Sequence, residues 1–245
     1  MKIIISPPFW LILQVTYAYT EQLALGRFSY TEFIQQIWHD SHSVHQSSFR
    51  SLKRLSAYKV NLLRVIPSHL LSCFENLEEL DIRSCSATQF IFNINENRVR
   101  KPSGIFRLKS LYLFNLPKLE HVWDKDPKGI IGLKVLKEVR VSRCECLKSL
   151  FPASVAKDLT RLEVLEVTEC EELAEIFWKD EKGEEGEGTT PQFVFARLTS
   201  LTLKQLPGFK YSIRCSKEEV ISQLCLQLKL VYTYIHNQMY KRVWD

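Results

Sequence analysis

The chain has 245 residues, of which 45% are hydrophobic and 25% are charged, and its formal net charge is +5. These proportions are typical of soluble folded proteins, and they exclude a disordered chain or one made mostly of membrane spans. No run of Lys and Arg reaches the length of about five to eight residues that marks a nucleic-acid-binding patch. We therefore expect no nucleic-acid partner.

Residues 1–20 predict an irregular N-terminal cap over the first repeat. Their apolar run follows an early lysine and ends near Ala18, which resembles a secretory signal peptide. Pro7 and Pro8 interrupt the run, which is too short to form a stable membrane span. A signal peptide over residues 1–18, and hence a secreted protein, remains the alternative to the cap.

Residues 21–211 repeat one spacing of apolar residues. The clearest copy places them at Leu159, Leu162, Leu165, Val167, Cys170, Leu173 and Ile176. The two-residue step predicts a short strand with both apolar side chains facing inward, and the three-residue steps on either side predict turns around a core. This is the spacing of leucine-rich repeats.

About seven degenerate copies are present. Their inward strand pairs are Leu23 and Leu25, Leu55 and Ala57, Leu80 and Ile82, Leu111 and Leu113, Val139 and Val141, Leu165 and Val167, and Leu201 and Leu203. In the second copy the same steps also place Val60 and Leu63 inward. The pattern predicts an α/β leucine-rich-repeat solenoid, or horseshoe, with a parallel concave β-sheet and an irregular or short-helical convex side.

Three of the seven cysteines, Cys85, Cys144 and Cys170, each stand three residues after a strand residue. We expect them to be buried thiols, because recurrence at one position of successive coils requires no disulfide. The sequence also contains no Asn-x-Ser/Thr glycosylation site. Both features favour a reducing, cytoplasmic environment.

The longest interval between copies contains residues 180–190, an acidic and glycine-rich stretch that predicts a disordered loop. Beyond Tyr211 the spacing changes to that of an amphipathic helix. Residues 212–245 therefore predict a helical C-terminal cap or an atypical tail, because a solenoid needs its last apolar edge covered.

The sequence lacks the glycine-rich phosphate-binding motifs, the Gly-x-Ser-x-Gly motif of hydrolases and the His-Glu-x-x-His zinc motif. A metal site is an alternative at His39, His42 and His45, but their serine-rich segment favours a hydrated loop between coils. We expect no enzymatic activity, no metal and no cofactor.

Function is therefore sought on the outward side of the predicted strands, where every second residue faces away from the core. Adjacent strands would align these residues into rows. One row is predicted to contain Ser56, Asp81, Tyr112, Arg140, Glu166 and Thr202, and another to contain Tyr58, Arg83, Phe114, Ser142, Thr168 and Lys204. Exposed aromatic and arginine side chains on a rigid sheet commonly anchor protein interfaces. The candidate protein-binding residues are Tyr58, Asp81, Arg83, Tyr112, Phe114, Arg140, Glu166 and Lys204. The alternative is that charges such as those of Arg140 and Glu166 only pair across strands.

Four stretches carry a family resemblance, namely Phe74 to Cys85, Leu108 to Trp123, Leu136 to Phe177 and Phe195 to Phe209. They resemble the C-terminal repeats of plant coiled-coil nucleotide-binding leucine-rich-repeat disease-resistance proteins. The resemblance extends from about Phe33 to Tyr211.

The resemblance implies a protein-binding role in plant innate immunity. In that family the repeats sense a pathogen effector or a guarded host protein, and they hold a nucleotide-binding switch inactive. The expected partners are therefore an effector, a guarded host protein or a nucleotide-binding domain of the same family. The coiled coil and the nucleotide-binding domain themselves are absent from this sequence, so nucleotide exchange and downstream signalling are not implied.

Overall fold

The computed structural model describes seven stretches of the chain, residues 2–4, 21–26, 49–60, 62–94, 106–127, 132–178 and 197–209. The predicted acidic loop, the C-terminal cap, the three histidines and most of the predicted N-terminal cap lie outside these residues. No described helix is long and apolar enough to cross a membrane.

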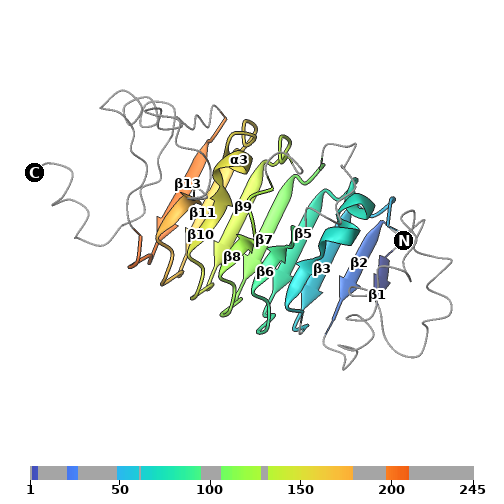
Figure 1. Ribbon diagram of the computed structural model, residues 1–245, viewed down its shortest axis with the longest axis horizontal. Coiled ribbons are helices and arrows are strands. Elements are labelled where there is room, and N and C mark those ends of the chain that lie inside the picture. Colours follow the sequence, from blue (N-terminus) through green and yellow to red (C-terminus); the bar gives the residue numbers. More distant parts are fainter. Residues whose placement is uncertain are drawn as a thin grey trace, which may run out of the picture.

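The described residues form a solenoid whose coils stack side by side along the chain (Figure 1). Eight parallel strands form one sheet, called here the long sheet, in the order in which they occur in the sequence. These strands are β1 (Lys2–Ile4), β2 (Gln22–Leu25), β3 (Arg54–Tyr58), β5 (Glu79–Arg83), β7 (Ser110–Phe114), β9 (Glu138–Ser142), β11 (Val164–Thr168) and β13 (Ser200–Lys204). The last seven contain the seven predicted strand pairs, and the predicted leucine-rich-repeat fold is confirmed.

A second parallel sheet, the short sheet, lies on the other side of the coils. It consists of β4 (Arg64–Ile66), β6 (Phe90–Phe92), β8 (His121–Trp123), β10 (Ser149–Pro152) and β12 (Glu175–Trp178). The helices described on this side are short, a 3-10 helix η2 (Ser68–Phe74) and an α-helix α3 (Ala153–Ala156). The sequence predicted the short helices but not this sheet.

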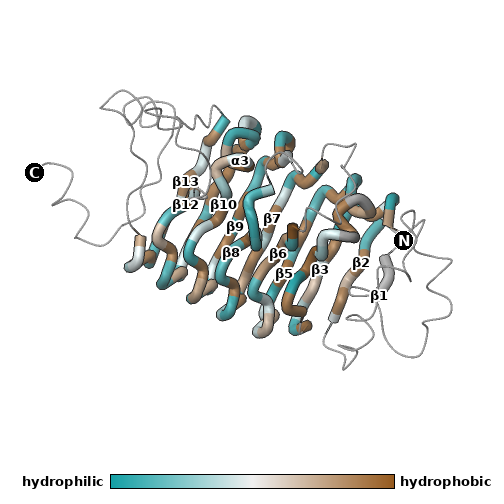
Figure 2. Tube along the Cα trace, in the orientation of Figure 1, coloured by the Kyte–Doolittle hydropathy of each residue, from teal (hydrophilic) through white to brown (hydrophobic). Residues whose placement is uncertain are grey.

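The core lies between the two sheets as one continuous cluster of buried apolar residues. Each central long-sheet strand alternates buried and partly exposed residues, as in Glu138–Ser142, where Val139 and Val141 are fully buried. Figure 2 shows hydrophobic and hydrophilic stretches alternating along the coils. Because each coil covers its neighbours, the core grows by addition of repeats.

The three-residue step after each strand has a backbone cause. One residue directly after each of six strands has a φ between 53° and 57°, and none of the six is glycine. At Arg143, for example, this left-handed conformation reverses the alternation, so that the next residue, Cys144, points inward. The Arg143 amide also continues the ladder by donating a hydrogen bond to the Thr168 carbonyl oxygen at 3.1 Å.

We expect Arg143→Gly to be more stable than Arg143→Ala by about 1 kcal/mol, because glycine adopts a positive φ without the steric cost that a Cβ brings. Both variants lose the exposed ion pair between Arg143 and Glu169, so their difference isolates the backbone. Urea unfolding midpoints of the two variants measure it. Equal midpoints would show that the conformation carries no strain at this position.

One inward residue was predicted wrongly. Leu63 is 43% exposed, and Leu62 and Val65 are buried in its place. In the register of the short sheet, Val65 is paired with Ile91 of the next coil. The segment from the positive-φ residue Lys59 to Val65 is one residue shorter than the corresponding segment from Ser84 to Ile91. The three-residue step therefore shifts by one position.

The predicted burial of Cys85, Cys144 and Cys170 is confirmed, and all three are free thiols. Each sulfur lies near the carbonyl oxygen two residues earlier, at 3.4 Å for Cys85 and Cys170 and 3.6 Å for Cys144. A hydrogen bond with the neighbouring Cys170 thiol, together with burial, raises the pKa of Cys144. Cys144 therefore acts as a small protonated core residue.

On the short sheet, burial lowers the pKa of His121, and the charge of Lys148 lowers it further. The unfolded chain therefore binds more protons than the folded chain just below the ordinary histidine value of about 6.5. The stability that neutral His121 contributes is present above about pH 6.5 and is lost as the pH falls below it.

We expect His121→Asn, which can keep the 2.9 Å hydrogen bond to the Ser149 hydroxyl, to lose less stability than the wild type between about pH 7.5 and 5.5. Urea midpoints of both proteins at the two pH values test this expectation. An equal drop in both proteins would assign the pH dependence to other groups.

Candidate functional site

The outward side of the long sheet, called here the outer face, carries three rows of side chains. The register of the strands places Ser56, Asp81, Tyr112, Arg140, Glu166 and Thr202 in one row. The next row contains Tyr58, Arg83, Phe114, Ser142, Thr168 and Lys204. Both rows have the membership that the sequence predicts, because parallel strands in a solenoid repeat the same position in every coil. The third row, at the start of the strands, contains Arg54, Glu79, Ser110, Glu138, Val164 and Ser200.

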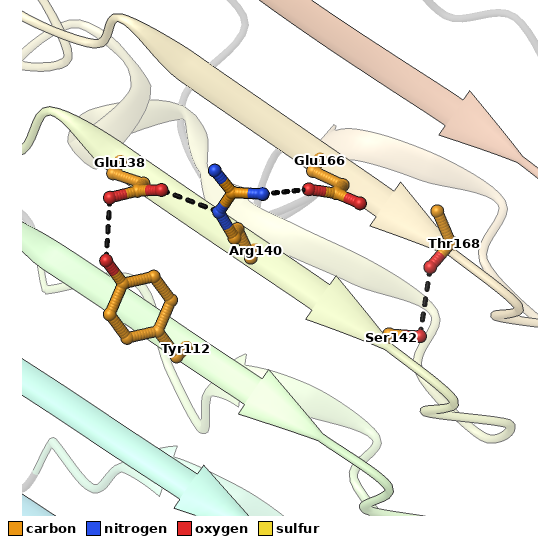
Figure 3. Close-up of polar contacts among 6 residues, drawn as sticks. All are labelled: Tyr112, Glu138, Arg140, Ser142, Glu166 and Thr168. Atoms are coloured by element: carbon orange, nitrogen blue, oxygen red, sulfur yellow. Dashed lines mark hydrogen bonds and ion pairs between the residues drawn. The ribbon is translucent and has the colours of Figure 1, made fainter. Parts of the chain in front are cut away.

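A polar network joins three strands of the outer face (Figure 3). The Tyr112 hydroxyl donates to a Glu138 carboxylate oxygen at 2.6 Å, and Arg140 Nε donates to the other oxygen at 2.6 Å. Arg140 also donates from Nη1 to Glu166 on the next strand. The predicted cross-strand pairing of Arg140 with Glu166 is thus present, and a tyrosine extends it.

The network shifts the pKa values of Tyr112 and Glu138. Burial raises the pKa of Tyr112, and the hydrogen bond to Glu138 raises it further. Burial opposes ionisation of Glu138, but the hydrogen bonds from Tyr112 and Arg140 outweigh it and lower the pKa of this carboxyl. At neutral pH Tyr112 is therefore a neutral phenol, and Glu138 is an ionised carboxylate that accepts hydrogen bonds from Tyr112 and the Arg140 guanidinium.

Cations lie against aromatic rings in the next row. The Arg83 guanidinium carbon is 4.7 Å from the centre of the Phe114 ring, while Arg83 Nε donates to Asp81 at 2.7 Å. Lys59 Nζ lies 4.9 Å from the centre of the Tyr58 ring. These contacts hold flat apolar surfaces and charges at fixed positions on the exposed sheet.

All eight predicted residues lie on the outer face, and the structure brings most of them together. Asp81, Arg83 and Phe114 form one contact group. Tyr112, Arg140 and Glu166 belong to the polar network, while Tyr58 and Lys204 stand apart at opposite ends of their row.

Sequence reasoning missed two members of the site. Glu138 connects Tyr112 with Arg140, but it was not among the predicted binding residues. Lys59 was missed because it follows the strand, in the positive-φ turn. The available signal was the three-residue step from Ala57 to Val60. A step of three residues instead of two leaves one additional residue on the outward side.

The chemistry that this face offers is recognition. It presents ionised groups and hydrogen-bond donors beside exposed aromatic rings, which is the composition of protein-binding surfaces. Within the described residues, no group of three or more His, Cys, Asp or Glu could hold a metal ion.

Comparison with known families gives one match. The model described as plant disease resistance protein RPS2-like, leucine-rich repeats, matches residues 22–171, which is more than half of the chain. The matched region contains β2 to β11 and most of the outer face. Searches of curated proteins and of solved structures gave no significant match.

Proposed function

This chain belongs to the family of RPS2-like leucine-rich repeats of plant disease resistance proteins, and we propose that it is a non-enzymatic, cytoplasmic protein-binding module of plant innate immunity. Its partner is a pathogen effector, a guarded host protein or a nucleotide-binding domain of the same family. In the last case the repeats hold the nucleotide-binding switch inactive. The protein-binding part of the proposal follows from the family. The side chains of the outer face, and the contacts that hold them, support the choice of this surface.

One observation carries the choice of surface. Tyr112, Phe114 and Arg140 occupy neighbouring strands and are held by contacts within the sheet before any partner arrives. Such pre-organisation lowers the entropy cost of binding, and Tyr and Arg are the residue types over-represented among binding hot spots. Opposite charges that only stabilise the sheet would not require aromatic rings beside them.

A pull-down of the full chain with a nucleotide-binding domain of the family tests the proposal. We expect the triple variant Tyr112→Ala, Phe114→Ala, Arg140→Ala to weaken capture by at least about tenfold, because hot-spot truncations commonly cost more than 1 kcal/mol each. The matched control is Arg64→Ala, Phe90→Ala, Trp178→Ala, which removes one arginine and two aromatic side chains from the short sheet.

Circular dichroism of both triple variants verifies the fold. Capture that is unchanged in the outer-face variant, or weakened equally in the control, would contradict the assignment of this surface. The same comparison applies when an effector or a guarded host protein replaces the nucleotide-binding domain.

A further inference from the structure

Charge on the outer face is sorted along the strand direction. The strand-end rim is defined here as the last residue of each strand from β3 to β13 in the long sheet, together with the positive-φ residue that follows it. Its charged residues are Lys59, Arg83, Arg143 and Lys204 against Glu169, which gives 4 − 1 = +3. In the other two rows of the same strands, Arg54 and Arg140 stand against Glu79, Asp81, Glu138 and Glu166, which gives 2 − 4 = −2.

The rim also carries the most accessible aromatic ring of the described residues. Tyr58 is 47% exposed at one end of the rim, and Phe114 is partly exposed near its middle. Within the described residues, neither Lys59 nor Lys204 has a carboxylate within 4.0 Å. Within the described part of the chain, the rim therefore combines two lysines that have no paired carboxylate with apolar surface.

We propose that the protein partner lays an extended acidic segment along the strand-end rim, with an apolar side chain against Phe114 and carboxylates at Lys59 and Lys204. The proposal rests on the proposed function, because it names the kind of protein segment that the outer face binds. The six strands span about 24 Å at about 4.8 Å per strand step. An extended segment of about seven residues covers that distance.

The arrangement of carboxylates favours an acidic peptide over a nucleic acid. Asp81 and Glu166 lie in the row adjacent to the rim, about 7 Å away along the strands. The continuous phosphate charge of a nucleic acid would meet these carboxylates as well as the cations. A peptide can place its carboxylates only where the cations stand.

Fluorescence anisotropy with the full chain tests the proposal. The probe is a fluorescein-labelled peptide Asp-Glu-Asp-Phe-Glu-Asp-Glu, and the comparison probe replaces Asp and Glu with Asn and Gln. We expect the acidic peptide to bind at least about tenfold tighter at about 50 mM NaCl, with an advantage that shrinks at about 300 mM because salt screens exposed charges.

Two variants with the same change in net charge locate the site. We expect Lys59→Gln, Lys204→Gln to weaken binding of the acidic peptide about tenfold, because both cations lie on the rim. The matched control, Lys109→Gln, Lys137→Gln, removes two lysines that precede β7 and β9 and are paired with Glu78 and Glu163. We expect it to change binding less than about twofold, since these charges are already compensated.

Equal losses in both double variants, or equal affinity for the two peptides, would overturn the proposal. Tighter binding of a single-stranded oligonucleotide through Lys59 and Lys204 would overturn it in favour of nucleic acid. If a family partner is captured through Tyr112, Phe114 and Arg140 but independently of Lys59 and Lys204, the acidic segment is wrong and the proposed function stands. If capture of a family partner depends on neither set of residues, the proposed function itself is rejected.

Discussion

Replacing Val141 with Asp is expected to unfold the central coils, whereas Asp at the neighbouring Ser142 is expected to leave them folded. Val141 is fully buried in β9, and Ser142 lies on the outer face one residue later. An isolated carboxylate at position 141 would have no hydrogen-bond or charge partner in the apolar core. Its desolvation costs several kcal/mol, a large part of the roughly 5 to 15 kcal/mol that stabilises a folded domain.

Ser142→Asp places the same charge on the exposed side. It disturbs the hydrogen bond that Thr168 Oγ1 donates to Ser142 Oγ, and we expect a cost of at most about 1 kcal/mol. Circular dichroism and urea unfolding of both variants measure the contrast. Comparable unfolding of both would mean that the alternation of inward and outward residues fails in β9.

The same alternation explains what the sequence could predict. In a stack of coils, each strand pair such as Val139 and Val141 has only one inward orientation, and coil-to-coil pairing then fixes the rows of the outer face. The membership of both rows followed from the sequence for this reason. The buried position of Cys144 followed as well, since its place after the strand recurs in other coils.

The short sheet could not be predicted because its strands are too short to show a period. β8 buries two consecutive residues, Val122 and Trp123, and β12 buries Ile176 alone, so neither strand shows an apolar residue at every second position. Val122 and Ile176 were interpreted as turn residues. Pairing arises because neighbouring coils place these segments side by side in parallel, which no single repeat reveals.

The hydrogen-bond partners of the outer-face side chains also could not be predicted from the sequence. Arg140 could have paired with Glu166 alone, but it also bonds Glu138 on its own strand, and Tyr112 completes the chain of contacts. Several donors and acceptors lie within reach of one another in such rows. Side-chain geometry decides among them, and spacing along the sequence does not.

Replacing Trp123 with Ala is expected to cost about 3 to 5 kcal/mol of unfolding free energy. Trp123 is 1% exposed, and its ring stacks on Phe92 at a centroid distance of 4.3 Å. Phe106 packs edge-on against the other ring of this stack, at 5.9 Å from Phe92. Truncation would leave a cavity between the coils of β6 and β8, and the pairing of these parallel strands prevents it from collapsing.

The Trp178→Ala variant serves as the control, because Trp178 is only partly buried at the edge of the short sheet and we expect a smaller loss.

A Trp123→Phe variant separates packing from hydrogen bonding. The Trp123 indole Nε1 is buried without a hydrogen-bond partner within the described part of the chain. Phenylalanine keeps an aromatic ring on Phe92 and removes this unpaired donor, whose burial costs about 1 to 3 kcal/mol.

The gain from removing the unpaired donor should offset most of the lost ring volume, so we expect Trp123→Phe to remain within about 1 kcal/mol of the wild type. Urea unfolding of the three variants gives the comparison. A loss for Trp123→Phe as large as that for Trp123→Ala would mean that the indole N–H is satisfied in solution and that the stack with Phe92 contributes little. A small loss for Phe with a large loss for Ala would place the stability of these coils in the aromatic stack between β6 and β8.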